Sequence, residues 1–481
     1  MKTEGILTID IGTSSVRVTL FDLDGARLDG AEQKVFSGAS FDAEERVELV
    51  FTLMERVASR NPGVEVLRIC PSTLISWVFA RKDGSAAAGA YTFTHYCQEE
   101  RDRFLEHFPE EAFYRSTGRT LSAELPLFKL AWLKKADRAT YDAADWLLSF
   151  QGYIGLRLTG RAAMDRTFAA FTGLSDIRAG GWDPEIAQAA GVDVDKLPPQ
   201  CGAVKIIGTL TPNLQRRLSI GPAQVVCGTS DGSAGALGSG VTVPGEGVDV
   251  MGTTDVFYAL SDHPVFERGA RLCVHPHPLP GLWLVGGATG LTGGAFDWAV
   301  NVLGEKHASF AEIDRQMEEI PPGSGGLKAV CAFSGERAPR WRTDIRGGLV
   351  GLGVEHTLAH CCRALSEAAG YLAREICELL AREGLPVQTV TAIGGGAKAD
   401  TLLQLRSDIL GCAVKTPEHL DATTRGCYAL AALSLGRAPE EVPVNRERKR
   451  FQPRPEAVRT YDRLYEEYQA FYQRYAGFIK K

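Results

Sequence analysis

A carboxylate followed by glycine and hydroxyl residues stands close to the start of the chain. Asp10 ends an apolar stretch, and Gly12, Thr13 and Ser14 follow it almost directly. A tight glycine turn between two strands lets backbone N–H groups and hydroxyls approach phosphate oxygens, and a carboxylate at the end of a strand can hold Mg²⁺ directly or through water. The same residues are typical of an ordinary hairpin, so this motif alone leaves a phosphate site and a plain turn equally open.

A turn of the same type returns halfway along the chain. When Gly12 is placed on Gly252, the two segments share a glycine, a threonine, a valine, a leucine and an aspartate in register. Such an internal repeat predicts two related lobes, and two facing hairpins, the second containing Thr253, can hold one polyphosphate. Asp10 has Val250 as its counterpart, so only the first copy offers a carboxylate, and this suits a single Mg²⁺.

A third motif places one carboxylate where a strand passes into a helix. The mostly apolar residues 223–226 are followed by small residues that present Asp231 and continue as a helix rich in glycine and alanine. An aspartate in this place can accept the proton of a substrate hydroxyl. It can also serve as the helix N-cap, which is a very common use of aspartate, and the motif alone favours that use.

Three consecutive glycines, Gly394, Gly395 and Gly396, follow an apolar strand and precede a helix that begins near Asp400. Glycines in such a turn allow the backbone to approach a nucleotide closely, with the adenosine lying across them. A plain glycine loop is the alternative. The chain contains no Gly-x4-Gly-Lys-Ser/Thr sequence, and the three glycines do not form Gly-x-Gly-x-x-Gly. Neither a Walker-type site nor a dinucleotide fold is therefore favoured.

Regular elements must hold these motifs in place. Residues 6–11 and 16–21 alternate as the two strands of a hairpin, and a turn signal follows them before a third strand. Apolar residues at helical spacing predict further elements. The predicted helices are 125–135, 142–158, 358–382, 400–411 and 455–478.

The length of 481 residues exceeds what one ordinary hydrophobic core supports, so two lobes are expected. Pro244, Gly245 and Gly247 cluster near the middle of the chain and indicate a boundary. We therefore predict lobes of residues 1–243 and 244–481.

Composition and charge exclude several classes of protein. Hydrophobic residues make up 44% of the chain, the net charge is −6, and no basic run is interleaved with aromatic residues, so a nucleic-acid partner is not expected. No stretch approaches roughly 18 apolar residues and no secretory leader precedes the first strand, which predicts a cytoplasmic protein without a membrane partner. The eleven cysteines include no Cys-x-x-Cys pair, in keeping with free thiols in a reducing compartment. A homodimer stays open as the assembly.

These motifs, in this order and over essentially the whole chain, resemble the FGGY family of carbohydrate kinases, which includes glycerol, xylulose, ribulose and gluconate kinases. Further segments similar to the family are Ser-Gly-Glu-Arg-Ala-Pro at 334–339, Arg-Gly-Gly at 346–348, Leu-Thr-Gly at 158–160 ahead of Asp165, Gly-Gly-x-x-x-Trp at 293–298, and most of a family signature at 126–133. The resemblance implies an α/β protein with two ribonuclease-H-like lobes of the actin-like ATPase superfamily and the active site in the cleft between them. It also implies that the N-terminal lobe, 1–243, binds sugar and carries catalysis, and that the C-terminal lobe, 244–481, binds the nucleotide.

By the same resemblance, Asp231 corresponds to the catalytic base of the family and Asp10 to its metal-associated carboxylate. Asp297 and Asp400 stand where glycerol kinases often have amides. The implied cofactors are ATP and Mg²⁺. The implied nucleotide-binding positions are Gly12, Thr13, Ser14, Arg17, Gly252, Thr253, Gly293, Asp297, Gly395, Gly396 and Asp400.

The acceptor side departs from the family. Where the family commonly has Gln-Met-His and then Trp-x-Asp-x-Arg, this chain has Cys-Pro-Ser-Thr at 70–73 and Tyr-Thr-Phe-Thr-His-Tyr-Cys-Gln at 91–98, so a charged, bidentate clamp on the sugar is missing. Aromatic, hydroxyl, imidazole and amide groups suit a neutral acceptor, which favours a xylulose-like ketopentose or a polyol over an aldonate such as gluconate. Arg166, beside Asp165, is the residue most able to reverse that preference by pairing with a carboxylate. The candidate acceptor-binding residues are Ser72, Thr94, His95, Asp165, Arg166 and Asp231.

The sequence therefore predicts an ATP-dependent carbohydrate kinase in which Asp231 orients and deprotonates a sugar hydroxyl for attack on the γ-phosphorus of Mg·ATP. One alternative is a gluconate-type aldonate kinase. Another is a non-catalytic nucleotide-binding protein of the same fold, which the altered 91–98 segment suggests and the retention of Asp10 and Asp231 opposes. An actin-like or heat-shock-type ATPase, with water as the acceptor, is disfavoured by the Gly-Glu-Arg-Ala-Pro segment.

Overall fold

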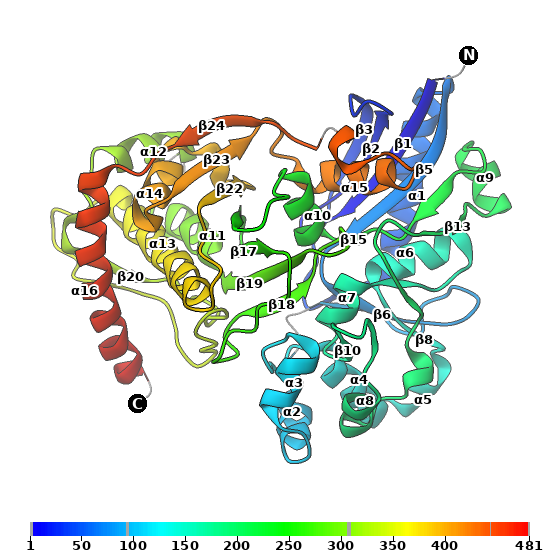
Figure 1. Cartoon of the computed structure of the whole chain (residues 1–481), viewed down its shortest axis with the longest axis horizontal. Coiled ribbons are helices and arrows are strands. Elements are labelled where there is room, and N and C mark those ends of the chain that lie inside the picture. The colour runs from blue at the N-terminus through cyan, green and yellow to red at the C-terminus, as the bar shows by residue number, and fades with distance from the viewer. Residues whose placement is uncertain (1–2, 93–95, 305–308, 443, 480–481) are drawn as a thin grey trace. The chain divides into compact units, whose positions relative to one another are not determined.

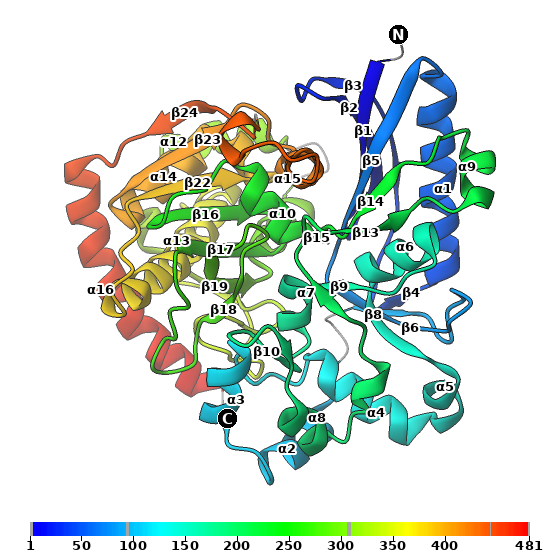
Figure 2. The same ribbon diagram turned by 45° about the vertical axis from the view of Figure 1, so that its right-hand side comes forward.

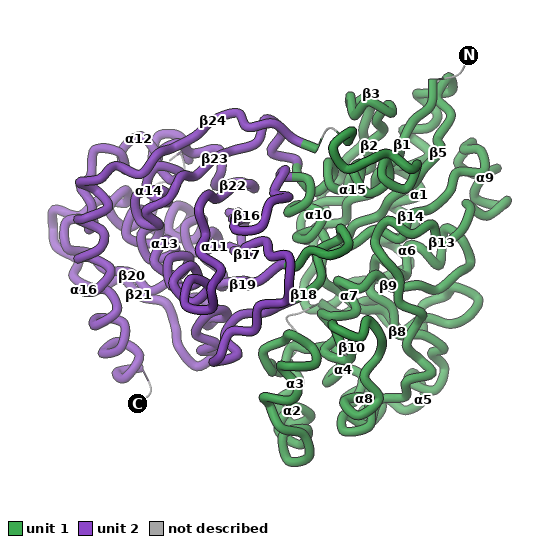
Figure 3. The backbone as a smooth tube through the Cα atoms, in the orientation of Figure 1, with its two compact units in different colours: residues 1–238, 275–283, 422–444 green, residues 239–274, 284–421, 445–481 purple. Residues whose placement is uncertain are grey.

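The computed structural model describes residues 3–92, 96–304, 309–442 and 444–479. It is a mixed α/β protein whose chain divides into two compact units (Figure 1, Figure 3). The first crossing between the units, at Gly238 and Ser239, lies close to the boundary predicted at residues 243 and 244. Later segments return to unit 1, so a single boundary does not describe the division. Unit 1 comprises residues 1–238, 275–283 and 422–444, and unit 2 comprises residues 239–274, 284–421 and 445–481.

The central sheet of unit 1 begins with three antiparallel strands, β1 (Thr3–Ile11), β2 (Ser15–Asp22) and β3 (Arg27–Lys34). Helix α1 (Ala43–Arg60) follows them and leads to β5 (Val64–Thr73), which lies parallel to β1 (Figure 2). A crossover of this kind is needed because parallel neighbours cannot be joined by a tight turn. The predicted hairpin and its third strand are confirmed.

Short strands and helices complete unit 1. The other strands are β4 (Ser40–Phe41), β6 (Ser76–Ala80), β7 (Ala90–Thr92), β8 (Trp146–Ser149), β9 (Met164–Asp165), β10 (Ser175–Asp176), β11 (Gly181–Trp182), β12 (Gln200–Cys201), β13 (Ile206–Thr209), β14 (Gln224–Val226) and β15 (Thr229–Ser230). The other helices are α2 (Gln98–Leu105), α3 (Glu110–Thr117), α4 (Pro126–Ala136), α5 (Arg138–Ala143), α6 (Phe150–Thr159), α7 (Arg166–Phe171), α8 (Pro184–Ala190), α9 (Pro212–Leu218), α10 (Asp231–Gly238) and α15 (Ala422–Leu433). The central sheet has the order β13-β14-β5-β1-β2-β3, with β15 also paired to β5, and a smaller sheet has the order β4-β7-β6-β8.

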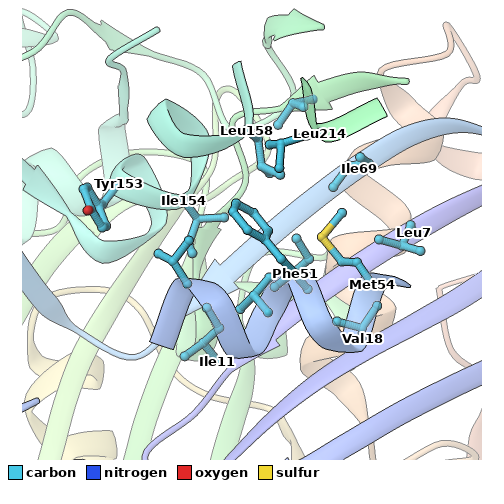
Figure 4. Close-up of a cluster of buried hydrophobic side chains, with 14 of the residues drawn as sticks. Leu7, Ile11, Val18, Phe51, Met54, Ile69, Tyr153, Ile154, Leu158 and Leu214 are labelled. Atoms are coloured by element: carbon cyan, nitrogen blue, oxygen red, sulfur yellow. The ribbon is translucent and has the colours of Figure 1, made fainter. Parts of the chain in front are cut away.

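The main core of unit 1 lies between the central sheet and the helices that cover it (Figure 4). Alternation along β1 and β2 turns Leu7, Ile11 and Val18 to the same side, where Phe51 and Met54 of α1 meet them. Each of these side chains is at most 2% exposed. Because burial of apolar surface is the dominant favourable term in folding, this layer fixes the ends of β1 and β2 in place.

Unit 2 repeats the arrangement of unit 1. Strands β16 (Glu246–Met251) and β17 (Asp255–Ser261) form an antiparallel hairpin, and β22 (Thr389–Ile393) lies parallel to β16. The same relations link β1 to β2 and to β5. The duplication predicted from the two glycine turns is therefore confirmed.

The rest of unit 2 continues this sheet on both edges and covers it with long helices. The other strands are β18 (Cys273–Pro276), β19 (Trp283–Gly290), β20 (Lys328–Val330), β21 (Gly348–Val350), β23 (Ala413–Pro417) and β24 (Glu447–Phe451). The last two residues of β18 and the first of β19 belong to the segment 275–283 of unit 1. The helices are α11 (Thr292–Trp298), the π-helical turn Ala299–Leu303 that continues it, α12 (Phe310–Glu318), α13 (Leu358–Arg382), α14 (Asp400–Leu410) and α16 (Pro455–Ile479). The main sheet has the order β18-β19-β17-β16-β22-β23-β24.

Helical periodicity located most of the long helices. The predicted segments 125–135, 358–382, 400–411 and 455–478 correspond to α4, α13, α14 and α16 to within one residue at either end. No helix in the described ranges is long and apolar enough to cross a membrane.

The helix predicted over residues 142–158 is wrong, because this segment contains β8 and then α6. Strand β8 pairs antiparallel with β6, with Trp77 opposite Ser149. The Ser149 hydroxyl then caps α6 by accepting a hydrogen bond from the Gly152 N–H over 3.1 Å. A short apolar run fits a buried strand or a helix equally well, and here the pairing with β6 decides.

Candidate active site

Three parallel strands of unit 1 bring predicted site residues to one edge of the central sheet. Asp10 of β1 lies opposite Ser72 of β5, and Ser72 lies opposite Thr229 of β15. Asp231 follows Thr229 by two positions and is the first residue of α10. The carboxyl ends of strands that run in one direction meet at one edge, which is the usual place of ligand sites in α/β sheets. The two predicted carboxylates, Asp10 and Asp231, therefore lie at the same edge of the same sheet.

Asp10 is partly buried and held by two neighbours. The Ser72 hydroxyl donates a hydrogen bond to Asp10 Oδ1 over 3.3 Å, and Arg17 Nη1 lies 3.5 Å from Asp10 Oδ2. Arg17 also pairs with Glu32, at 3.2 Å. The side chains of Asp10 and Arg17 are 14% and 25% exposed, so the carboxylate still reaches the surface. Arg17, which was predicted to bind the nucleotide, is thus the charge partner of the predicted metal carboxylate.

The residues around Asp10 suit a Mg²⁺ ion that is held partly by the protein and partly by water and substrate phosphates. Among the described residues, no group of three or more His, Cys, Asp or Glu side chains is placed to hold a metal ion. Mg²⁺ keeps several waters and is commonly bound through one or two carboxylates together with substrate phosphates. Asp10 offers one partly exposed carboxylate beside a turn that carries hydroxyl groups, which is the kind of site that binds Mg²⁺ together with phosphates. In that turn Thr13 and Ser14 are exposed, and the Gly12 N–H donates to the Ser15 carbonyl over 2.9 Å.

Asp231 stands at the start of α10 but does not cap it. The hydroxyl of Ser230 accepts a hydrogen bond from the Ser233 N–H over 3.3 Å and so fills the capping position. Burial raises the pKa of Asp231 to about 6, against the opposing effect of the Gly232 N–H, which donates to Asp231 Oδ1 over 2.7 Å. A carboxylate in this state is mostly ionised at neutral pH and more basic than an ordinary aspartate, which suits a general base.

Asp165 has the capping role that Asp231 lacks. Its carboxylate accepts hydrogen bonds at the start of α7 from the N–H groups of Thr167, over 3.1 Å, and Phe168, over 3.3 Å. It also accepts one over 3.0 Å from the hydroxyl of Thr229, on the strand that leads to Asp231. The side chain is 1% exposed, and burial raises the pKa of Asp165 to about 7. Asp165 therefore fixes the strand that precedes the catalytic candidate.

The other acceptor candidates are placed differently. Arg166 is exposed, and its guanidinium lies beside Gly180, where an added Cβ would be 3.5 Å from Arg166 Cζ. Ser72 is fully buried at the sheet edge. Thr94 and His95 lie outside the described residues. The structure thus groups Ser72 with the two candidate carboxylates, Asp10 and Asp231, and gives Arg166 a separate, exposed position.

In unit 2, the predicted nucleotide-binding glycines meet at the end of β16. A Cβ added at Gly293 would lie 2.0 Å from the carbonyl oxygen of Gly252, so α11 begins in direct contact with the β16–β17 turn. The Gly294 N–H donates to the Thr253 carbonyl over 2.9 Å. This close approach requires glycine at position 293 and ties the start of α11 to the turn.

The triple-glycine turn reaches the same strand end from β22. A Cβ added at Gly394 would lie 2.9 Å from the carbonyl oxygen of Met251, and one added at Gly396 would lie 2.9 Å from Met251 Cβ. Gly394 also has a φ of +90°, which favours glycine. Gly395 differs, since an added Cβ there would have no neighbour within 4 Å. Gly395 therefore faces open space, as a backbone surface for a nucleotide must.

The two acidic residues predicted on the nucleotide side lie on the helices that follow these glycines. Asp297 is exposed on α11, about one helical turn after Gly293. Asp400 is the first residue of α14 and pairs with Lys449 of β24, with Nζ 2.7 Å from Asp400 Oδ2. Asp400 thus carries a charge that Lys449 already balances.

A buried cluster of charges lies behind the hairpin of unit 2. In Arg406 of α14, Nη1 lies 3.2 Å from Asp249 Oδ2 on β16, and Nη2 lies 2.9 Å from Asp255 Oδ2 on β17. None of the three side chains is more than 6% exposed. Burial raises the pKa of Asp249 well above its usual range, although Arg406 acts in the opposite direction. Arg406 therefore fastens both strands of the hairpin to α14.

Three residues were not predicted from the sequence as part of a site. Thr229 and Ser230 lie beside Asp231 in unit 1, and Arg406 lies behind the hairpin of unit 2. Ser230 and Ser233 have the spacing of a cap and the residue it bonds, and this signal identifies the cap. Arg406 gave no comparable signal, because its partner Asp255 lies 151 positions earlier in the chain.

Comparison with known proteins identifies the family to which this chain is similar. Residues 94–238 match the N-terminal domain, and residues 247–435 the C-terminal domain, of the FGGY family of carbohydrate kinases. The xylulose kinase of Bacillus subtilis is 28% identical over 375 residues, which cover 77% of this chain and 75% of that protein. The gluconokinase of the same organism is 25% identical over 459 residues, which cover 90% and 88%. A crystal structure of gluconate kinase from Lactobacillus acidophilus matches with a TM-score of 0.91 at 23% identity, over 99% of this chain and 100% of that one. The predicted actin-like fold with two lobes is confirmed.

Proposed function

The chain belongs to the FGGY family of carbohydrate kinases, and we propose that it transfers the γ-phosphoryl group of ATP to a hydroxyl of a neutral acceptor, a xylulose-like ketopentose or a polyol. As a member of this family it is a phosphotransferase that acts on a sugar hydroxyl and uses ATP. The relative named xylulose kinase supports the ketopentose. The uncharged character of the 91–98 segment supports a neutral acceptor in general.

The observation that carries the proposal is the environment of Asp231. Ser230 caps the helix, so the Asp231 carboxylate is available, and its pKa of about 6 makes it a useful base at neutral pH. In the proposed reaction Asp231 takes the proton of the acceptor hydroxyl. The acceptor oxygen forms the new bond to the γ-phosphorus while the bond from that phosphorus to the β–γ bridging oxygen breaks, and ADP leaves with the bridging oxygen.

The phosphate-binding and metal-binding roles are also part of the proposal. The turns at residues 12–14 and at Gly252 and Thr253 bind phosphate oxygens through backbone N–H groups and hydroxyls. When bound, Mg²⁺ neutralises charge on the phosphate oxygens, and Asp10 is the carboxylate proposed to hold it. The nucleotide side is assigned to unit 2. Its proposed residues are Gly252, Thr253, Gly293, Asp297, Gly395, Gly396 and Asp400.

A gluconate-type aldonate kinase is the second candidate. The match to a gluconokinase over 90% of this chain favours it, as does the presence of a guanidinium, Arg166, next to Asp165. The exposed position of Arg166 beside Gly180 weakens that second argument.

The test is ATP consumption with neutral ketoses, polyols and aldonates at equal concentration. We expect the highest kcat/KM for a neutral ketopentose or polyol, with activity lost in Asp231→Asn. An aldonate turned over best, and lost on Arg166→Ala, would replace the neutral acceptor by the second candidate. ATP turnover that no acceptor increases would contradict both.

A further inference from the structure

Arg119 is a buried cation that forms no ion pair with another described residue. It lies between α3 and α4 of unit 1, and its side chain is 6% exposed. Its Nε and Nη1 atoms are buried and make no hydrogen bond within the described part of the chain. Its backbone N–H, by contrast, donates to Thr117 Oγ1 over 3.2 Å. A buried guanidinium is costly unless it is paired and hydrogen-bonded, so this position needs a reason other than stability.

The surroundings of Arg119 offer aromatic faces in place of a carboxylate. Its Cζ lies 4.8 Å from the ring centroid of Phe171, an arrangement that offsets part of the cost of burying the charge. The ring of Phe171 in turn lies 4.8 Å from that of His275. Burial and, secondarily, the charge of Arg119 lower the pKa of His275 well below its usual range. His275 is therefore neutral at physiological pH and brings no competing charge to the guanidinium.

Helix α7 connects Arg119 to the candidate active site. Phe171 is the last residue of this six-residue helix, and Asp165 caps its first turn. Asp165 is bonded to Thr229, on the strand that leads to Asp231. The two ends of α7 are roughly 9 Å apart, a separation comparable with the length of an extended five- or six-carbon chain. Arg119 is thus placed to meet the far end of an acceptor whose near end lies at the Asp231 side.

The Arg119 loop is also joined to the segment that lacks a charged clamp. The Cys97 N–H, within residues 91–98, donates to the Ala123 carbonyl over 2.9 Å. Residues 91–98 contain no lysine or arginine. The neighbouring loop does carry a guanidinium, that of Arg119, whose Nε and Nη1 have no hydrogen-bond partner among the described residues.

We propose that Arg119 binds oxygen atoms of the acceptor at the end remote from the transferred hydroxyl, and so supplies the guanidinium that the 91–98 segment lacks. This rests on the proposed function. The planar fork of N–H donors binds a pair of oxygens, which a ketose offers as hydroxyl and carbonyl groups and an aldonate offers as a carboxylate.

The test is Arg119→Met, which keeps the length and apolar packing of the side chain. Removing hydrogen bonds from a charged donor should raise the KM for the acceptor by at least about tenfold. The KM for ATP should stay near the wild-type value. Because Arg119 Nε and Nη1 have no hydrogen-bond partner in the described ranges, the melting temperature of the variant without ligands should equal or exceed that of wild type. A structural arginine would give the opposite result, a lower melting temperature.

Arg46→Met is the matched control. Arg46 is likewise buried and lies over a phenylalanine, with Cζ 4.5 Å from the Phe41 ring centroid. Its Nη1 donates to Ser37 Oγ over 3.0 Å and its Nη2 to the Phe36 carbonyl over 3.2 Å. We expect Arg46→Met to lower the melting temperature and to leave the KM for the acceptor unchanged.

Acceptor binding measured by thermal shift separates this proposal from the kinase assignment. Each sugar of the panel that raises the melting temperature of wild type should raise that of Arg119→Met less, whether or not it is phosphorylated. A larger loss for aldonates than for ketoses would identify a carboxylate as the partner, and the reverse would identify hydroxyl and carbonyl groups. A variant with a lower melting temperature and an unchanged acceptor KM would overturn the role of Arg119. If Arg119→Met does not fold, Arg119→Lys with wild-type acceptor KM would overturn it as well.

Discussion

Ser230 caps α10, and this leaves the carboxylate of Asp231 for another use. The substitution Asp231→Asn keeps the shape of the side chain but removes its ability to take a proton. We expect the variant to fold and bind ATP while kcat falls by roughly 10²–10⁴-fold, the usual contribution of a positioned general base. Steady-state kinetics, together with calorimetry of ATP binding, measures both quantities. Near-normal turnover would remove Asp231 from the reaction.

Asp183→Ala is the control for a capping aspartate. The Asp183 carboxylate accepts hydrogen bonds from the N–H groups of Glu185 and Ile186 at the start of α8, both over 3.0 Å. Its loss should lower the free energy of unfolding by about 0.5–2 kcal/mol and leave kcat unchanged.

The raised pKa of Asp231 also predicts how pH affects stability and rate. The pKa is about 6 in the folded chain against a usual value of 3.8, so the fold favours the protonated form. The stability that this proton contributes is fully present below the usual pKa and is lost as the pH rises through about 6. At pH 7, Asp231→Asn should therefore melt no lower than wild type, and any difference should shrink towards pH 4. The kcat/KM of wild type should decline as the pH falls below about 6. A clearly lower melting temperature of the variant at pH 7 would contradict the assignment.

Asp10 and Glu32 share one cation, and this allows the metal role to be isolated. Arg17 lies 3.5 Å from Asp10 Oδ2 and 3.2 Å from Glu32 Oε1. Asp10→Ala removes the proposed Mg²⁺ ligand, and the Mg²⁺ concentration for half-maximal rate should rise at least about tenfold, which corresponds to about 1.4 kcal/mol. Glu32→Gln weakens the other pair of Arg17 and should leave the Mg²⁺ dependence as in wild type. Equal Mg²⁺ titrations for Asp10→Ala and wild type would show that Asp10 is not the metal carboxylate.

Single residues were predictable where a motif fixes them and not where a distant partner does. The motifs placed Asp10 and Asp231 at strand and helix ends, and both lie there. The pairing of Asp10 with Arg17 depends on the register of the β1–β2 hairpin, and a slip of one residue would turn every side chain to the opposite face. The guanidinium of Arg119 lies over Phe171, which is distant in the sequence, so the sequence around Arg119 gives no sign of this contact.

At the scale of elements, glycine-rich turns between strands and helices were the most reliable signal. The chain needs glycine at Gly293 and Gly394 because backbone atoms of Gly252 and Met251 occupy the space of a side chain. The prediction failed for β8, where four residues pair with β6 inside a segment that otherwise reads as helical. Local patterns identify an element when it is long, and tertiary pairing decides when it is short.

The attachment of the β16–β17 hairpin to α14 can be tested at Arg406. Arg406→Met leaves the carboxylates of Asp249 and Asp255 buried without their cation, and should lower the free energy of unfolding by about 3–5 kcal/mol, measured by urea denaturation. Because the hairpin carries the Gly252 turn, the KM for ATP should rise as well. Replacing all three residues by apolar ones removes the unpaired charge and should restore most of the stability. A single variant as stable as wild type would mean that this cluster does not hold the hairpin.

At the scale of the whole molecule, helix α15 shows that the units are assembled from distant segments. A Cβ added at Gly238 of α10 would lie 1.8 Å from the Ala422 carbonyl oxygen, and one added at Gly426 of α15 would lie 1.9 Å from the Ala234 carbonyl oxygen. The two helices therefore touch through their backbones. The Tyr428 hydroxyl also donates to the carbonyl of Leu23 over 2.8 Å, although 405 positions separate them. Composition and periodicity describe residues that are neighbours in sequence. For this reason the sequence indicated a single boundary and gave no sign that residues 422–444 belong to unit 1.

The place of α15 in unit 1 predicts how fragments of the chain will behave. The fragment 1–243 follows the boundary read from the sequence but lacks α15, whose residue Tyr428 is fully buried in a cluster with Ile6, Phe21 and Val226. Removing one buried aromatic side chain alone costs about 3–5 kcal/mol, and a native domain is stable by only about 5–15 kcal/mol. We expect 1–243 to lack a cooperative thermal transition by circular dichroism, and a fragment that joins 1–238 to 422–444 through a flexible linker to regain one. The linked fragment differs from fragment 1–243 essentially by the presence of α15. Cooperative melting of both fragments at the same temperature would therefore show that unit 1 is complete without this helix.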